Sequence, residues 1–159
     1  MVCLKSPLPL LSPVRPNFPP LHPLFSKASE LTEIVIGAAI EVHRNKGPGL
    51  IESIYEWCLV TELELRRLAC ASQKLVIIDY KGFKREEPLR FDVLVEGCLL
   101  VEAKALQNVL PIHKAQLLSY MKLLDVPLGL LINFHEPRLT NGVHRLRFFP
   151  DLRFLCCLL

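Results

Sequence analysis

Three charged residues, Asp92, Glu102 and Lys104, interrupt two apolar segments that have the composition of β-strands. Their neighbours are mostly valine, leucine, phenylalanine and cysteine. Two carboxylates and an ammonium group are costly to bury without partners. A divalent cation would neutralise the carboxylates, and the lysine could orient or activate a water molecule. These residue types therefore indicate a candidate metal-dependent hydrolytic site.

Hairpin register decides whether Asp92 and Glu102 meet, because a one-residue slip moves a side chain to the other face of a sheet. A three-residue loop at 96–98, with Gly97 in the turn, is a common hairpin type and places the two carboxylates opposite each other. A two-residue loop would place them on opposite faces. Glu102 and Lys104 share a face in either case, since side chains alternate along a strand. The alternative is a salt bridge on a solvated face, which the apolar neighbours disfavour.

Glu52 is a further acidic candidate. It shares a helical face with Tyr55 and Leu59, which are typical core residues. This face predicts that the carboxylate points inward. The alternative is that Glu52 only stabilises the first turn of its helix, where the helix dipole favours a negative charge.

An expected helix at 111–124 carries polar candidates as well. His113, Gln116 and Tyr120 have the spacing that places them on one helical face. Apolar residues run beside them, and a stripe that mixes polar and apolar residues indicates a helix edge that lines a cleft. The alternative is ordinary amphipathic packing at the boundary between core and solvent.

Hydrophobic periodicity predicts the elements that position these residues, in the order helix, helix, three strands, helix, two strands. The expected helices span 29–45, 50–68 and 111–124, and the expected strands span 74–80, 89–95, 99–104, 128–134 and 143–149. Ser29 is the expected N-cap of the first helix. Lys81-Gly82 is an expected turn, and a polar edge segment is expected at 83–88.

Prolines divide the chain of 159 residues. They concentrate in residues 1–28, which we expect to form a disordered extension. Residues 29–149 are sufficient for one domain with a sizeable core. Residues 150–159 form an expected apolar tail.

Bulk composition narrows the class of protein. Hydrophobic residues make up 51% and charged residues 22% of the chain, which is typical of a globular domain. The net charge is only +3, so a broad basic surface for strong nucleic-acid binding is not expected. The six cysteines have no zinc-type spacing and suit reduced thiols in the cytoplasm. No segment approaches the ~18 apolar residues of a membrane span, and prolines interrupt any signal-peptide core.

These motifs resemble those of a known family. The G-x-x-E-x-x-Y signature of the GxxExxY proteins is similar to the segment at 49–55, G-L-I-E-S-I-Y. The D…(D/E)-x-K core of the PD-(D/E)XK nuclease superfamily, in which the GxxExxY proteins are placed, is similar to Asp92 with E-A-K at 102–104. The Q-x-x-x-Y element of RecB-like and exonuclease branches is similar to Q-L-L-S-Y at 116–120. The resemblance covers residues 31–148.

The resemblance implies a mixed α/β (α+β) fold, with a restriction-endonuclease-like αβββαβ core and an extra N-terminal helix. It also implies a site that depends on Mg²⁺ or Mn²⁺, with Asp92, Glu102 and Glu52 as metal ligands. Lys104 would position or activate the attacking water. The chain departs from the family pattern at 67–69, where a glycine is expected after the second helix.

Gln116 and Tyr120 are, by the same resemblance, the residues that orient the site or the substrate backbone. The implied activity is hydrolysis of phosphodiester bonds in DNA or RNA, with DNA the favoured partner, by a cytoplasmic protein that does not contact membranes. Near-neutral charge supports the alternative, a non-catalytic module that keeps the nuclease fold and binds nucleic acid or protein. A second copy of the chain or another protein would be a further partner.

Overall fold

The computed structural model of the protein describes residues 21–149. In chain order the elements are α1 (Phe25–Lys46), α2 (Glu52–Leu65), β1 (Cys70–Tyr80), β2 (Phe83–Val95), β3 (Leu99–Lys104), α3 (Pro111–Leu124), β4 (Leu128–Asn133), the 3₁₀ helix η1 (Leu139–Gly142) and β5 (Val143–Arg147). This order of helices and strands confirms the expectation from the sequence. The expected tail at 150–159 and most of the extension at 1–28 lie outside the described residues. Within residues 21–149, no helix is both long and apolar enough to cross a membrane.

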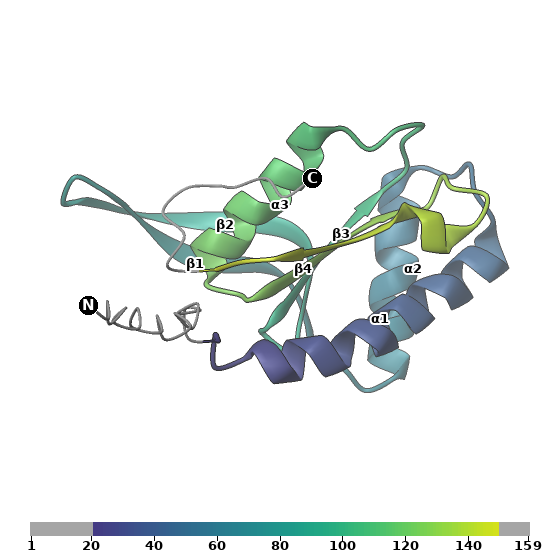
Figure 1. The fold of residues 1–159 in the computed structure, drawn as a ribbon, viewed down its shortest axis with the longest axis horizontal. Coiled ribbons are helices and arrows are strands. Elements are labelled where there is room, and N and C mark those ends of the chain that lie inside the picture. Colours follow the sequence, from purple (N-terminus) through teal and green to yellow (C-terminus); the bar gives the residue numbers. More distant parts are fainter. Residues whose placement is uncertain (1–20, 150–159) are drawn as a thin grey trace, which may run out of the picture.

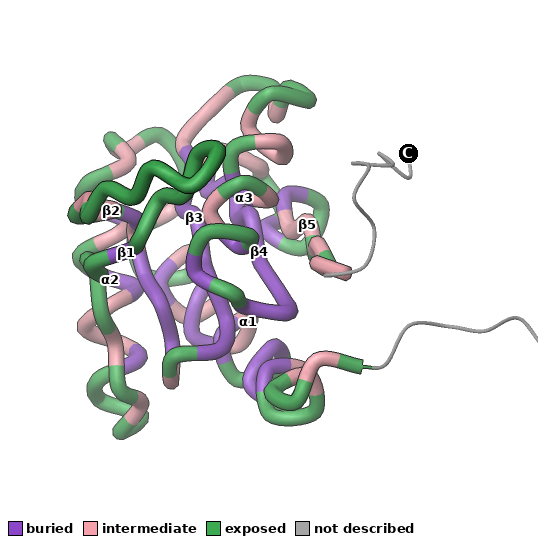
Figure 2. Tube along the Cα trace, turned by 90° about the vertical axis from the view of Figure 1, so that its left-hand side faces the viewer, coloured by how far each residue is buried: buried purple, intermediate pink, exposed green. Residues whose placement is uncertain are grey.

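The strands form one mixed sheet in the order β1-β2-β3-β4-β5. Neighbouring strands are antiparallel except β3 and β4, which are parallel and are joined through α3. Helices α1 and α2 cover one face of the sheet and α3 covers the other (Figure 1). Every residue of β3 and β4 is consequently buried (Figure 2), which explains the continuous apolar sequence of β4. The fold is thus the expected mixed α+β type.

Helix α1 begins at Phe25, so the expected start at Ser29 is wrong. Tertiary contacts hold the added turn, because the Arg147 guanidinium lies 4.2 Å from the centroid of the Phe25 ring. Ser29 lies inside the helix, and its hydroxyl accepts a hydrogen bond of 2.9 Å from Arg145 instead of capping. The last residues of the expected extension at 1–28 therefore belong to the folded domain.

Strands β1 and β2 are also longer than expected. Strand β1 begins at Cys70 rather than at Lys74, and the segment 83–88 is part of β2 rather than a separate polar edge. The turn at Lys81-Gly82 is confirmed, and the two strands pair from this turn back to the body of the sheet. Strand pairing satisfies the backbone N–H and C=O groups of polar and apolar residues alike. The polarity of the side chains therefore did not predict where these strands begin or end.

Helix α2 ends at Leu65, before the expected limit at Leu68. Arg67 follows with a φ of 63°, in the left-handed region that favours glycine. This is the segment in which the family pattern leads to the expectation of a glycine. The chain therefore keeps the backbone geometry of that turn with a different residue.

Candidate active site

The β2–β3 hairpin brings the candidate carboxylates to one place. Val95 pairs with Leu99, so the loop comprises residues 96–98 and the three-residue alternative is confirmed. The Ala103 N–H donates a hydrogen bond of 2.8 Å to the Oδ2 atom of Asp92 instead of to a backbone carbonyl of β2. This bond ties Asp92 to the strand that carries the other carboxylate and the lysine.

A bulge in β2 aims Asp92 into the site. The register between β1 and β2 shifts between Ala71 and Gln73, which leaves Phe91, Asp92 and Val93 without one-to-one partners on β1. Phe91 packs into the core under α3, whereas Val93 packs into the core under α1 and α2. The two buried side chains fix the backbone on either side of Asp92. Bulges often re-aim a side chain beside a functional site, and this one is anchored in both cores.

Lys104 joins carboxylates from two different elements. Its Nζ donates hydrogen bonds to Glu102 Oε1 on β3 and to Glu52 Oε1 on α2, each at 2.9 Å. Glu102 and Lys104 are only 4% and 9% exposed, so their charges depend on this pairing. The Oε2 atom of Glu102 is also buried, and none of the described residues forms a hydrogen bond with it.

The pKa values of the site reflect this crowding. Burial raises the pKa of Asp92, the charge of Glu102 raises it further, and the result is about 7 although Lys104 lowers it. Burial alone would lower the pKa of Lys104, but hydrogen bonds to Glu102 and Glu52 outweigh it and raise that pKa above its ordinary value. Burial and the charges of Glu52 and Glu102 also raise the pKa of Glu56. The acids of the site thus carry more negative charge than Lys104 neutralises.

These side chains open into a cleft of about 500 Å³. Its lining consists of Glu52, Glu56, Ser72, Gln73, Arg90, Phe91, Asp92, Glu102, Lys104, Gln116 and Tyr120. The set includes all the residues to which the family resemblance assigns a role, which are Glu52, Asp92, Glu102, Lys104, Gln116 and Tyr120. Of the others, Glu56 had a local signal, because it lies one helical turn after Glu52. Gln73 and Arg90 had none, because they meet only through the pairing of β1 with β2.

Helix α3 supplies Gln116 and Tyr120 to the cleft. The Gln116 Nε2 donates a hydrogen bond of 3.4 Å to the Tyr120 hydroxyl. His113, expected on the same helical face, has a different part: its Nδ1 accepts a hydrogen bond of 3.1 Å from the Leu110 N–H and caps the helix. It does not line the cleft.

Tyr55 positions the start of α2, and hence Glu52. Its hydroxyl donates to the Gly47 carbonyl at 2.6 Å and accepts from the Leu50 N–H at 3.0 Å. Gly49, between these two contacts, has a φ of 106°, which favours glycine. Each of the three motif residues in the segment at 49–55 thus has a physical role. The glycine permits the turn, the glutamate lines the cleft, and the tyrosine holds the turn and the start of α2 in place.

The acidic residues fit a divalent cation in part. The Glu102 Oε2 atom has no hydrogen-bond partner among residues 21–149, and burial and the charge of Glu102 raise the pKa of Asp92. Both observations indicate more negative charge than Lys104 alone compensates. Mg²⁺ is commonly held by one or two carboxylates together with water and substrate phosphates. Within residues 21–149, no group of three acidic, histidine or cysteine side chains is placed to hold a metal ion. The arrangement therefore fits an ion held by Asp92 and Glu102, with Glu52 available once Lys104 releases it.

Comparison with known proteins gives one match. A family model described as the PD-(D/E)XK nuclease superfamily matches residues 29–146, which include the whole cleft. The five-stranded mixed sheet with helices on both faces is consistent with the restriction-endonuclease-like fold of that superfamily. A search of curated proteins and a search of solved structures each found no match.

Proposed function

The chain belongs to the PD-(D/E)XK nuclease superfamily, and we propose that it hydrolyses phosphodiester bonds of DNA or RNA with the help of a divalent cation. The convergence of Asp92, Glu102 and Lys104 in one cleft carries this proposal. The G-x-x-E-x-x-Y segment supports a narrower assignment to the GxxExxY proteins, because its glutamate reaches the same cleft. DNA is the substrate that we propose to test first.

Asp92 and Glu102 are the residues that would hold Mg²⁺ or Mn²⁺, with Glu52 as a third ligand. When bound, such an ion lowers the pKa of a coordinated water and polarises a phosphoryl oxygen. The Glu102 Oε2 atom is the free position on the buried carboxylate. Burial and the charge of Glu102 raise the pKa of Asp92. A positive charge bound beside Asp92 would favour the ionised carboxylate.

Lys104 is the residue that would act on the attacking water and on the phosphate. Two carboxylates hold its ammonium group in a defined position at the cleft. Because its pKa is raised, Lys104 keeps its proton at neutral pH and serves as a donor and a positive charge rather than as a base. A preorganised cation of this kind stabilises negative charge that develops during the reaction. Gln116 and Tyr120 would orient the substrate backbone from α3.

A non-catalytic module that binds nucleic acid or protein is the second candidate. The observation in its favour is that Lys104 already pairs with both Glu102 and Glu52, and that no three-residue metal group exists within residues 21–149. For either candidate we propose a cytoplasmic location. The thiols of Cys58, Cys70 and Cys98 support it, because they form no disulfide with one another.

Cleavage assays on single- and double-stranded DNA and RNA, with Mg²⁺ or Mn²⁺, test the proposal. Asp92→Asn and Lys104→Met are the site variants, and Glu33→Gln on the exposed face of α1 is the matched control. We expect both site variants to lose about 100-fold or more in rate, while the control keeps wild-type activity. The melting temperature of the wild-type protein should rise with Mg²⁺. If a folded wild-type protein cleaves none of these substrates with either ion, the non-catalytic module is the better description.

A further inference from the structure

The outer part of the β1–β2 hairpin, residues 77–86, projects from the body of the protein as a two-stranded ribbon, here called the arm (Figure 1). All residues of the arm are exposed (Figure 2). Large apolar side chains are among them: Ile77 is 64%, Tyr80 68% and Phe83 81% exposed. Contiguous exposed apolar surface of this kind commonly marks an interaction site.

The tip of the arm has a defined shape. Lys81 and Gly82 have φ values of 54° and 88°, which correspond to a tight two-residue turn. The Asp79 carboxylate supports this turn by accepting a hydrogen bond of 3.1 Å from the Gly82 N–H. Tyr80 pairs with Phe83 across the turn, so both rings project from the same face of the ribbon. The tip therefore presents two aromatic side chains on a rigid support.

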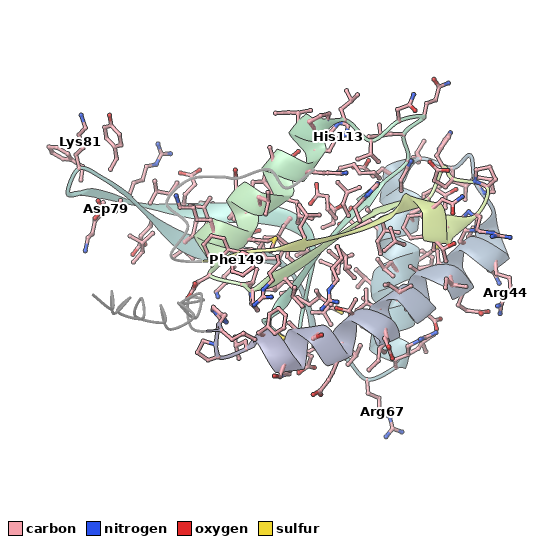
Figure 3. The ribbon with its side chains drawn as sticks, viewed as in Figure 1. Arg44, Arg67, Asp79, Lys81, His113 and Phe149 are labelled. Atoms are coloured by element: carbon pink, nitrogen blue, oxygen red, sulfur yellow. The ribbon has the colours of Figure 1, made fainter. Side chains whose placement is uncertain are left out.

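One unpaired positive charge lies beside these rings. Lys81, which lies at the end of the arm in Figure 3, has its Nζ 5.3 Å from the centroid of the Tyr80 ring. Among residues 21–149, no carboxylate is within salt-bridge distance of Lys81, whereas Arg85 pairs with Glu87. Lys84 pairs with Asp79 across the ribbon and so lies on the opposite face. Two aromatic rings beside an unpaired lysine are suited to nucleic acid, because bases stack on the rings and the ammonium group contacts a phosphate. A protein partner would explain the apolar side chains but not the unpaired charge.

The base of the hairpin is a wall of the cleft. Gln73 on β1 pairs with Arg90 on β2, and both residues line the cleft together with Asp92. A guanidinium at this position suits a phosphate. From Gln73 to Tyr80 the strand spans about 23 Å at about 3.3 Å per residue. Gln73 and Arg90 lie on the hairpin face opposite Tyr80 and Phe83, because the register is unbroken between the two pairs. A nucleic-acid strand in the cleft therefore reaches the tip around the edge of the hairpin.

We infer that the arm binds unpaired nucleotides of the strand that enters the cleft. Tyr80 and Phe83 stack on bases at the tip, Lys81 contacts a phosphate there, and Arg90 contacts a phosphate at the base of the hairpin. This inference rests on the proposed function for the identity of the polymer, since nucleic acid is the substrate class of the cleft. It adds that affinity for the polymer resides largely outside the cleft, about 23 Å along β1 from it.

Binding without cleavage tests the arm directly. Fluorescence anisotropy in EDTA would measure the affinity for a labelled single-stranded DNA three times as long as the distance from Gln73 to Tyr80. We expect Tyr80→Ala with Phe83→Ala to weaken binding about tenfold for each ring. Leu75→Ala with Ile77→Ala is the matched control, because it removes exposed apolar groups from the opposite face of the hairpin; it should leave the affinity within about twofold.

Charge provides a further measurement. Replacing Lys81 by glutamine should reduce the slope of log affinity against log salt by about 0.7. Lys84→Gln, on the opposite face of the ribbon, is the matched control and should reduce this slope less. Circular dichroism melting would show that each variant is folded.

Distinct outcomes overturn the inference. If the aromatic variant and its control lose affinity for the DNA equally, the two rings have no specific part in binding. Wild-type affinity in the aromatic variant, with a change from dimer to monomer on a sizing column, would assign the arm to a second copy of the chain. If the wild type cleaves nucleic acid and the aromatic variant binds it as tightly as the wild type, the inference about the arm is wrong and the proposed function stands. If the aromatic variant loses binding but the wild type shows no cleavage in Mg²⁺ or Mn²⁺, the inference about the arm stands and the proposed function is wrong.

Discussion

Replacing Asp92 by asparagine is expected to stabilise the metal-free protein at pH 8 while it removes activity. Burial and the charge of Glu102 raise the pKa of Asp92 to about 7 in the folded protein, whereas the ordinary pKa of an unburied aspartate is 3.8. Between these values the folded state binds more protons than the unfolded state, so stability falls as the pH rises. The contribution of the protonated carboxyl is fully present below about pH 4 and is lost as the pH passes 7.

The shift sets the size of the effect. A difference of about 3 pH units at about 1.4 kcal/mol each gives about 4 kcal/mol. Asp92 is partly exposed at the cleft, and solvent screening reduces the expected gain of Asp92→Asn to roughly 2–4 kcal/mol at pH 8. The asparagine carbonyl can still accept the hydrogen bond from the Ala103 N–H, so the variant loses the charge and keeps the contact.

Urea unfolding in EDTA at several pH values between 4 and 8 would measure this. Wild type should lose stability across the range relative to Asp92→Asn, and the two proteins should converge near pH 4. The control Asp79→Asn changes a carboxylate on the exposed β1–β2 turn and should follow the wild-type curve. Added Mg²⁺ should narrow the gap at pH 8, because it compensates the carboxylate that asparagine lacks. Parallel curves for wild type and Asp92→Asn over the whole range would refute the argument that Asp92 is buried without a compensating charge.

Two further predictions concern the contacts that hold the site together. Lys104→Met leaves Glu102 buried without its partner and should destabilise the protein by about 3–5 kcal/mol at neutral pH. In urea unfolding, the double variant Lys104→Met with Glu102→Gln should recover most of that loss, although it should not recover cleavage. Equal stability of the single and double variants would contradict the pairing. Tyr55→Phe removes the hydroxyl that bridges Gly47 and Leu50 and should cost about 1–3 kcal/mol, with a lower cleavage rate because the start of α2 is displaced; a wild-type melting temperature would show that the bridge is not needed.

Several site features could be predicted from the sequence because they depend on short-range rules. The 96–98 loop follows from Gly97 and the hairpin spacing, and it determines the register of β2 with β3. Pro111 marks the start of α3, as expected for the first turn of a helix. Periodicity predicted only the face of the strand or helix on which each candidate residue lies, and the resemblance to the PD-(D/E)XK nucleases implied that these residues meet in one site.

Other features depend on which segments pack together, and no local pattern encodes them. Helix α1 begins at Phe25, whose ring contacts Arg147 from far along the chain. The polar segment 83–88 became a strand because β1 offered it a backbone partner. His113 lies on the expected face of α3 but caps the helix instead of reaching the cleft.

The sequence by itself determined the type and order of the elements and the acids and lysine that they carry, because side-chain period and turn chemistry act over a few residues. Only the tertiary structure decided what surrounds those charges. The bulge that aims Asp92 depends on two separate cores, and the ammonium of Lys104 takes Glu52 from another element as its second partner. Burial and the placement of neighbouring charges, which set the pKa of Asp92, arise only when distant segments meet in one cleft.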